Sequence, residues 1–287
     1  MPLVFFRTFA AWLLLLVVLL GGCGGGEASP AAPPDTSPRQ QFYAPGLAAD
    51  VYLPATFAAA RPAVLLLHGG GWGAGDRGEF ADLARWLAAQ GVVAVAIDYR
   101  LTTAGYRWPA QLEDARHAVW WMRMHAGDLG IDPQRIAALG GSAGGLLAAW
   151  LAVDDAHDAA GRSDRVQAAV SLWGPWDLTQ PDDSLLPDAR GMLESLLGPG
   201  RPGARDASPY FRIAADSAPV LLVHGLDDRL VPPIQSQRAC ARYRELGARC
   251  DLLELPGEGH GLARSEDVNR VTEAVRAFLG RELLARR

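Results

Sequence analysis

The chain has 287 residues, 49% hydrophobic and 21% charged, which is ordinary composition for a globular protein with one substantial core. A formal net charge of −5, with no basic run or basic face, argues against a nucleic-acid-binding surface. The length is typical of a single α/β domain.

Residues 1–22 have the pattern of an export signal. One positive charge, Arg7, precedes an apolar run at Phe9–Leu20 that is too short for a membrane-spanning helix. The run ends in Leu20-Gly21-Gly22-Cys23, which resembles the lipobox of bacterial lipoproteins. In that family the cysteine thiol takes a lipid and becomes the mature N-terminus. The alternative is an ordinary secretory signal followed by a chance cysteine.

The lipobox resemblance implies an exported lipoprotein that a lipid on Cys23 holds to a membrane. Several acyl chains on one cysteine anchor a protein durably. Gly24 stands where an Asp would indicate retention at the inner membrane of a Gram-negative cell. The expected address is therefore the outer membrane, facing the periplasm, or the cell-surface membrane of a cell without an outer membrane.

Residues 23–41 are rich in Gly, Pro and Ser and have no hydrophobic period, which is typical of a flexible tether. The folded domain is expected to span 42–287 and to begin near Phe42. A segment near Phe42 and the run Asp50–Leu53 are expected to form an antiparallel edge of the sheet.

Beyond this edge, apolar strand-like runs alternate with helical patterns. The expected strands are 64–67, 92–97, 135–139, 166–172, 220–223 and 252–255. The expected helices are 79–90, 109–126, 144–153, 234–246 and 266–284. Strand runs such as Val92–Ile97 are continuously apolar, as expected when both faces of a parallel sheet are covered. The alternation predicts an α/β fold with a mostly parallel, doubly wound sheet flanked by helices.

One stretch, Gly174–Ser217, interrupts this rhythm. It is long, is rich in Pro, Gly and Asp, and contains a single short helical pattern at Arg190–Leu197. Long insertions between strands are usually functional. We therefore expect a partial cap over a site near 174–217.

Two cysteines, Cys240 and Cys250, lie in the folded part of the chain. An exported protein meets an oxidising compartment, which permits a disulfide that closes this short loop. Two small buried hydrophobic residues are the equal alternative. The sequence leaves both readings open.

Ser142 sits where an expected strand ends and an expected helix begins. The run Gly140–Gly144, GGSAG, fits the G-x-S-x-G pattern, in which a serine occupies a strained turn and exposes its hydroxyl. Glycines permit the crowding and the unusual dihedral angles of such a turn. The motif occurs by chance often enough that its context must support it.

The first supporting feature is His68–Trp72, HGGGW, directly after a strand. Acyl transfer generates an oxyanion, which fixed backbone N–H groups stabilise by several kcal/mol. Glycines let a loop bring those donors close, because no β-carbon stands in the way. A strand-ending glycine turn without function is the alternative.

The other two features are Asp228 in HGLDDRLVP and His260 in PGEGHG, each after a late strand. A histidine in a glycine-rich loop is poorly placed for core packing and is suited to general-base work. A loop aspartate that caps the next helix is the alternative reading, and it applies to Asp227. The order Ser142, Asp228, His260 is that of the α/β-hydrolases.

The chain resembles bacterial α/β-hydrolase esterases with an HGGGW loop, of the hormone-sensitive-lipase-like and feruloyl-esterase-like branches. The resemblance runs from about Asp50 to Phe278 and is carried by HGGGW, IDYRL, WPAQLEDARHAVWWMRMHAGDLGIDPQRIAALGGSAGG, ASPYF, PVLLVHGLDDRLVPPIQSQ and LPGEGHG. It implies the α/β-hydrolase fold and a catalytic triad in which Ser142 is the nucleophile, His260 the base and Asp228 the acid. It also implies an oxyanion hole from the backbone N–H groups of Ala143 and the Gly70–Gly71 region, and no metal or organic cofactor.

Several tryptophans fall near loops that follow strands. We interpret Trp72, Trp108 and Trp176 as walls of a pocket for a bulky or aromatic acyl group, with core packing as the alternative for each. Core packing is the preferred reading for Trp173.

The sequence therefore predicts a serine carboxylic ester hydrolase that works through an acyl-enzyme. Short-chain, small aromatic or acetylated esters are the expected substrates, either as small molecules or linked to a polysaccharide. A peptidase or amidase of the prolyl-oligopeptidase type is the alternative, as is a binding protein on a hydrolase fold. The sequence predicts no nucleic-acid partner and does not determine the oligomeric state.

Overall fold

The computed structural model describes residues 37–56, 60–180 and 186–284. Every described residue belongs to one compact unit, 36–287. The predicted signal peptide, Cys23 and most of the predicted tether lie outside the described residues. No helix among the described residues is long and apolar enough to cross a membrane.

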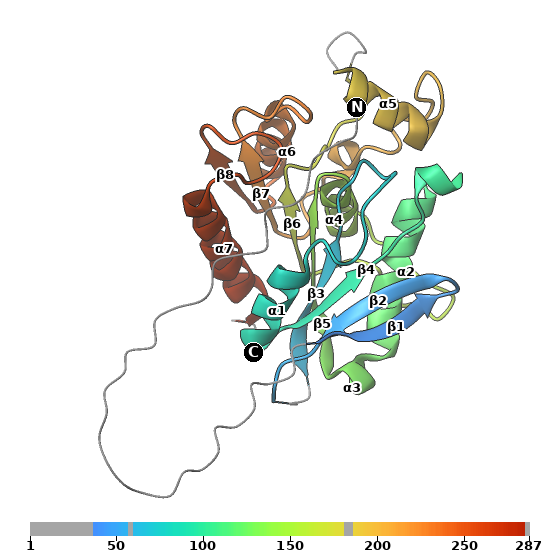
Figure 1. The fold of residues 1–287 in the computed structure, drawn as a ribbon, viewed down its shortest axis with the longest axis vertical. Helices are drawn as coiled ribbons and strands as arrows, with labels where there is room; N and C mark the ends of the chain where they lie inside the picture. Colours follow the sequence, from blue (N-terminus) through green and yellow to red (C-terminus); the bar gives the residue numbers. More distant parts are fainter. Residues whose placement is uncertain (1–36, 57–59, 181–185, 285–287) are drawn as a thin grey trace, which may run out of the picture. The chain divides into compact units, whose positions relative to one another are not determined.

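Eight strands form one twisted sheet in the order β1-β2-β4-β3-β5-β6-β7-β8 (Figure 1). Their bounds are β1 Arg39–Ala44, β2 Leu47–Tyr52, β3 Arg61–Leu67, β4 Val93–Ile97, β5 Ile131–Gly141, β6 Ala168–Leu172, β7 Val220–Gly225 and β8 Cys250–Leu255. The pairs β1–β2 and β2–β4 are antiparallel, and every later pair is parallel. The predicted parallel sheet and its antiparallel edge are both confirmed.

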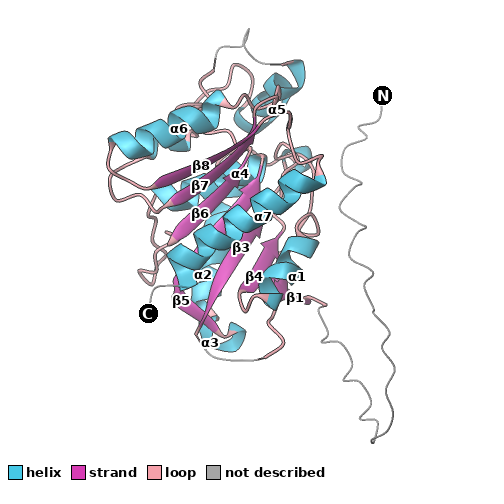
Figure 2. Cartoon of the chain, turned by 90° about the vertical axis from the view of Figure 1, so that its left-hand side faces the viewer, coloured by secondary structure: helices cyan, strands magenta, loops and turns pink. Residues whose placement is uncertain are grey.

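Helices cover both faces of this sheet (Figure 2). Their bounds are α1 Ala81–Ala89, α2 Ala110–Met124, α3 Ala126–Leu129, α4 Ala143–Val153, α5 Pro187–Leu197, α6 Ile234–Glu245 and α7 Ser265–Leu279. Side chains of α2, α4, α5 and α6 belong to one buried apolar cluster, and side chains of α1 and α7 belong to the other.

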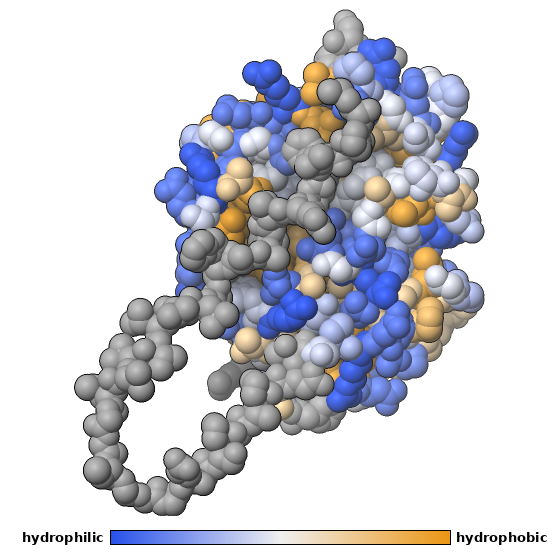
Figure 3. Space-filling view, in the orientation of Figure 1, coloured by the Kyte–Doolittle hydropathy of each residue, from blue (hydrophilic) through white to orange (hydrophobic). Residues whose placement is uncertain are grey.

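Alternation along the strands divides the core between the two faces, because successive side chains of a strand point in opposite directions. In β3, Leu65 and Leu67 pack with α2 and α4, whereas Val64 and Leu66 pack with α1 and α7. Both sets are buried, which explains why the run is continuously apolar in sequence. In Figure 3 the exposed face is mostly hydrophilic, with apolar residues in separate groups.

Several predicted boundaries differ from the observed ones. Strand β1 begins at Arg39, so it takes in the last residues of the predicted tether because they pair with β2. Pro109 precedes α2 rather than forming its first turn, and the Trp108–Pro109 peptide is cis. The final predicted helix is two pieces, because α7 ends at Leu279 and a π-helical turn, Gly280–Leu284, follows.

The structure decides the question left open for the two cysteines. Cys240 on α6 and Cys250 on β8 form a disulfide, and both residues are buried. The bond joins a helix to the strand beside it and is therefore part of the packing between α6 and the sheet.

Candidate active site

Ser142 lies at the sharp turn between β5 and α4, at the carboxyl end of the parallel strands. Its backbone has φ +52° and ψ −115°, a conformation that L residues rarely adopt. A hydrogen bond from the Ser142 amide to Leu172 O of β6, at 2.9 Å, holds the turn against the neighbouring strand. The strained geometry places the hydroxyl at the edge of the sheet, as the G-x-S-x-G pattern predicts.

The glycines on either side of Ser142 are required by close backbone contacts. A β-carbon on Gly140 would lie 2.2 Å from Gly144 O. A β-carbon on Gly144 would lie 2.0 Å from Leu67 O at the end of β3. Any larger residue would push α4 away from the strands and displace Ser142.

The structure brings Ser142, His260 and Asp228 into one hydrogen-bonded line. His260 Nδ1 lies 2.7 Å from Asp228 Oδ2, and because a carboxylate accepts, Nδ1 donates. His260 Nε2 is then free to accept from the Ser142 hydroxyl, 2.8 Å away. The serine, on the turn before α4, thus meets an acid that follows β7 and a base that follows β8. This arrangement can deprotonate the serine as it attacks a carbonyl.

Asp228 is buried and ionised. Burial raises the pKa of this carboxyl, but hydrogen bonds from His224 and His260 outweigh burial and lower the pKa to about 2. Its second oxygen accepts the amides of Leu230 and Val231, each at 2.9 Å. The carboxylate is therefore charged at neutral pH and can stabilise a positively charged His260.

A second histidine, His224 at the end of β7, contacts the same carboxylate. His224 Nε2 lies 2.8 Å from Val231 O and 3.2 Å from Asp228 Oδ2, and both atoms are acceptors, so Nε2 carries the proton. The Ser236 hydroxyl on α6 then donates to His224 Nδ1 at 2.7 Å. Both side chains are buried, and through these contacts they fix the position of Asp228.

The glycine loop after β3 lies beside Ser142. Gly70 and Gly71 have φ of +92° and +60°, and the Gly70 carbonyl accepts the amides of Gly73 and Ala74 at 3.1 Å. Within the described part of the chain, no acceptor is found for the amides of Gly70 and Gly71. The amide of Ala143 begins α4, where backbone N–H groups have no partner inside the helix. These donors can serve an oxyanion.

Packing beneath the glycine loop fixes its shape. His68 is buried, stacks on Tyr99 at 4.0 Å between ring centroids, and donates through Nδ1 to Gly69 O. Burial lowers the pKa of His68, so the ring stays neutral. The Tyr99 hydroxyl donates to His68 O at 2.9 Å. His68 therefore braces the glycine loop from beneath.

A cleft of about 510 Å³, its open mouth included, leads to Ser142. Its lining is mostly apolar and comes from the oxyanion loop, the start of the insertion, α5 and the loop before α6: Gly71, Trp72, Ser142, Pro175, Asp177, Leu178, Gln180, Ala189, Met192, Leu193, Leu230, Val231, Pro232 and Gln235. A β-carbon on Gly71 would lie 2.6 Å from Met192 Sδ, so α5 packs directly on the oxyanion loop. The described part of the insertion therefore covers the site, as its length predicted.

Of the three tryptophans predicted to wall the pocket, Trp72 alone is among the described residues that line the cleft. The interpretation of Trp176 is wrong: its side chain is 0% exposed and packs edge-on against Tyr243 on α6. Trp108 packs against Trp150, with ring centroids 5.7 Å apart, and is also not part of the cleft lining. Both positions follow the alternative reading, core packing.

Three residues near the triad were not predicted to be functional. His224 braces the loop after β7 through Val231 O, and Trp173 packs partly buried against the core, as the preferred reading has it, while its ring lies 6.4 Å from that of His260. Glu79 accepts the Gly69 amide at 2.9 Å, next to the oxyanion loop. A carboxylate two residues before a helix carries no sequence signal for this position, because only the fold brings it beside Ser142.

Comparisons with known proteins agree with this geometry. The BD-FAE family profile matches residues 49–242. The probable carboxylic ester hydrolase LipM of Mycobacterium tuberculosis is 33% identical over 232 residues, 76% of this chain and 54% of LipM. The carboxylesterase NlhH of the same organism is 33% identical over 230 residues, 74% of this chain and 69% of NlhH. The chain thus spans about half the length of LipM, and more of NlhH.

A solved structure has the same fold. It is a thermophilic esterase, Est2, from the planctomycete Thermogutta terrifontis, with a TM-score of 0.74 and 29% sequence identity. The match covers 87% of this chain and 94% of that chain. Together with the family profile, it confirms the predicted resemblance: the chain belongs to the BD-FAE family and has the α/β-hydrolase fold.

Proposed function

We propose that the protein is a serine carboxylesterase. The observation that carries this proposal is the hydrogen-bonded line from Ser142 through His260 to Asp228, beside backbone amides that have no acceptor in the described chain. The names of the relatives, carboxylic ester hydrolase and carboxylesterase, support the same activity.

In the proposed reaction Ser142 Oγ attacks the ester carbonyl while His260 Nε2 takes the hydroxyl proton. Asp228 stabilises the imidazolium, and the amides of Gly70, Gly71 and Ala143 bind the oxyanion. His260 then gives its proton to the leaving alcohol, and the acyl group stays on the serine. Water activated by His260 releases the acid and restores the enzyme.

The cleft supports short-chain or small aromatic acyl groups as substrates. Apolar side chains of α5, Met192 and Leu193, line the cleft together with Leu230 and Val231, which favours small apolar acyl groups. Structures of the Thermogutta terrifontis esterase are described as propionate-bound and butyrate-bound. We extend that size of acyl group to this chain, with the ester free or attached to a polysaccharide.

The experiment is hydrolysis of p-nitrophenyl esters from acetate to laurate by the full-length protein in mild detergent, with Ser142→Ala as control. We expect kcat/KM to be highest from acetate to butyrate and to fall by about 10⁴ or more in the variant. Absence of activity in folded protein, together with no labelling by a fluorophosphonate probe, would contradict the proposal. Labelling without ester hydrolysis would favour an amidase.

We also propose that a lipid on Cys23 anchors the protein to a membrane after export. The support is the Leu20–Cys23 step after a short apolar run. Labelling of cells with an alkyne fatty acid should mark the wild-type protein and not Cys23→Ala. Equal labelling of both proteins would contradict the lipid anchor. Separation of the cell membranes by density would then identify the membrane that carries the wild-type protein.

A further inference from the structure

A single glycine, Gly69, separates the carboxylate of Glu79 from Ser142. A β-carbon on Gly69 would lie 3.4 Å from Glu79 Oε1 and 3.5 Å from the Ser142 β-carbon. Glu79 Oε2 accepts the Gly69 amide at 2.9 Å, which fixes the carboxyl group in this place. Glu79 is half-buried, yet it is not part of the triad.

No cation neutralises this carboxylate within the described structure. Its one hydrogen-bond partner there is the Gly69 amide, and no ion pair includes it. The cation nearest in sequence, Arg77, is held by Asp50 and Asp98. Burial raises the pKa of the Glu79 carboxyl, the Gly69 amide lowers it and Asp76 raises it further. A half-buried negative charge without a partner favours the binding of a cation.

Two aromatic rings and the Glu79 carboxylate lie close to Gly141, the residue before Ser142. A β-carbon on Gly141 would lie 3.3 Å from Phe80 Cζ, 3.6 Å from Trp173 Nε1 and 3.7 Å from Glu79 Oε1. Phe80 and Trp173 are both partly buried and pack against the core. A carboxylate beside aromatic rings is the combination that recognises ammonium groups in proteins.

This group lies on the leaving-alcohol side of the serine. The rings of Trp173 and His260 are in edge contact, with centroids 6.4 Å apart, and His260 is the residue that protonates the leaving oxygen in the proposed reaction. None of Glu79, Phe80 and Trp173 is among the described residues that line the apolar cleft under α5. The acyl group and the alcohol therefore have separate places, one apolar and one anionic with aromatic walls.

We propose, resting on the proposed esterase function, that Glu79 with Phe80 and Trp173 forms a subsite for a positively charged leaving alcohol, so that esters of amino alcohols are preferred substrates. In the reaction the acyl C–O bond breaks, the proton on His260 Nε2 moves to the leaving oxygen, and the cationic alcohol departs with its charge unchanged. Glu79 binds the ammonium group and does not exchange a proton.

The test compares acetylcholine with 3,3-dimethylbutyl acetate, a neutral ester of the same shape, by following acid release in a pH-stat. We expect kcat/KM for the cationic ester to exceed that for the neutral one by about fivefold, which is the effect of one charge pair about 4 Å apart in a water-like dielectric. Glu79→Gln keeps an acceptor for the Gly69 amide and removes the charge, so the ratio should fall to about one. Asp82→Asn removes an exposed carboxylate on α1, three residues further along the chain, and should leave the ratio unchanged.

Two further measurements cover the other outcomes. Raising the salt concentration should lower the ratio in the wild-type protein, which gives a result even if Glu79→Gln does not fold. If neither acetate ester reacts while p-nitrophenyl acetate does, competitive inhibition by tetramethylammonium decides, with about fivefold weaker inhibition expected in Glu79→Gln. A ratio at or below one, or inhibition insensitive to Glu79, overturns the subsite but leaves the esterase. Failure on p-nitrophenyl acetate as well overturns the proposed function.

Discussion

Asp228 and Asp164 are similarly buried, at 4% and 1% exposed, but the pKa values of their carboxyl groups move in opposite directions. At Asp228, burial raises the pKa and hydrogen bonds from two histidines lower it to about 2. At Asp164, burial raises the pKa, and Arg116 and the Ala156 amide do not compensate fully. The pKa of Asp164 therefore lies above its ordinary value.

The surroundings of the two carboxyl groups explain the difference. Asp164 accepts one well-aligned hydrogen bond, from the Ala156 amide at 2.7 Å. Arg116 Nε lies 2.7 Å from the other oxygen but is not aligned to donate, and Arg116 also pairs with Asp154. Neighbouring Asp154 and Asp155 raise the pKa of Asp164 further. Asp228, in contrast, accepts from His260 Nδ1 and two backbone amides, and His224 Nε2 lies 3.2 Å from its Oδ2.

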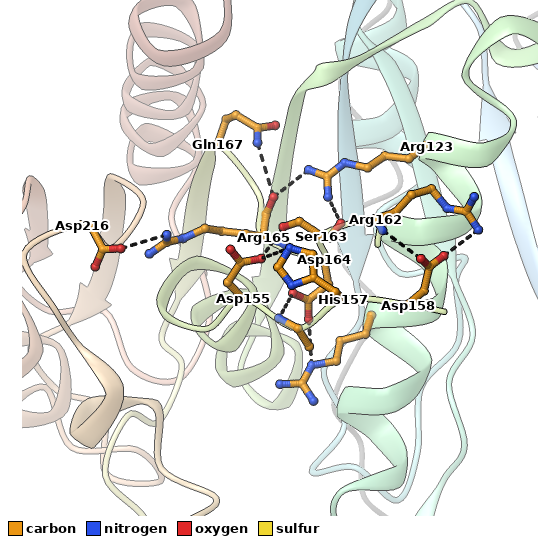
Figure 4. A network of polar contacts seen from close by, with 12 residues as sticks. Arg123, Asp155, His157, Asp158, Arg162, Ser163, Asp164, Arg165, Gln167 and Asp216 are labelled. Atoms are coloured by element: carbon orange, nitrogen blue, oxygen red, sulfur yellow. Dashed lines mark hydrogen bonds and ion pairs between the residues drawn. The ribbon is translucent and has the colours of Figure 1, made fainter. Parts of the chain in front are cut away.

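Asp164 belongs to the loop between α4 and β6, at the end of the sheet opposite the triad. Figure 4 shows this loop as a network in which arginines reach across to carboxylates and carbonyls. Arg123 donates to Arg165 O at 2.7 Å, and Arg165 pairs with Asp216 at 3.1 Å. Such pairs fix a loop, whereas the donors around Asp228 fix a charge state. Burial alone therefore does not identify a functional carboxylate, and the number of aligned donors does.

The largest expected effect is at Asp228. Asp228→Asn should lower kcat by about 10⁴ with little change in KM, because an amide holds the wrong His260 tautomer and does not stabilise the imidazolium. The kinetics of p-nitrophenyl acetate hydrolysis measure this. Asp164→Asn is the matched control and should leave kcat unchanged. A loss below tenfold in Asp228→Asn would contradict the role assigned to the triad.

Loss of Arg116, at the end of the sheet opposite Ser142, should lower stability and leave activity unchanged. Arg116→Leu leaves Asp154 and the buried Asp164 without their shared cation, so we expect the free energy of unfolding to fall by about 3 kcal/mol. Urea denaturation measures it, and kcat/KM should stay within twofold of wild type. A tenfold loss of kcat/KM in the folded variant would show that the two ends of the sheet are coupled.

Acidification should change the contributions of Asp228 and Asp164 to the stability of the fold in opposite directions. The folded pKa of Asp228 is about 2 and its ordinary value is 3.8, so its stabilisation is present above about pH 4 and is lost as the pH falls towards 2. This amounts to about 2 kcal/mol. Asp164, with its pKa raised, has the opposite sign and favours the folded state on acidification.

Denaturation between pH 5 and 2.5 measures this difference. The acid-induced loss of stability should be smaller in Asp228→Asn than in wild type and larger in Asp164→Asn. The same loss of unfolding free energy between pH 5 and 2.5 in all three proteins would contradict the two opposite pKa shifts.

The parallel sheet and the triad could be predicted because their signals are local. Continuous apolar strands and helical periodicity give the order of elements, and glycines beside Ser142 and His260 report tight turns where strands end. The same local patterns could not decide whether Cys240 and Cys250 pair, because that depends on how closely α6 approaches β8.

Positions that depend on side-chain direction were harder to predict. Trp176 follows a strand and looks like a pocket residue, but its ring turns inward onto Tyr243. Glu79 reads as an ordinary residue at a helix start, and only the approach of the loop after β3 to the Ser142 turn brings it to the nucleophile. The sequence gives the order of such residues along the chain but not the direction in which each side chain points.

The smallest expected effect is at His224, a positioning residue that acts through Asp228. Its Nε2 proton points at Val231 O and Asp228 Oδ2, and the Ser236 hydroxyl fixes that tautomer from the other side. His224→Leu removes a neutral donor but leaves the amides of Leu230 and Val231 on the carboxylate. We therefore expect kcat to fall by about tenfold, with KM nearly unchanged.

Rescue by a conservative variant separates positioning from mere packing. His224→Gln keeps a side-chain N–H that can reach the carboxylate, so its kcat should return to within about threefold of wild type. Ser236→Ala should give a loss between those of the Gln and Leu variants, because the imidazole stays but is free to turn. Equal kcat in the Leu and Gln variants, with equal stability, would mean that the second histidine only fills space and that Asp228 needs no more than His260 and its two amides.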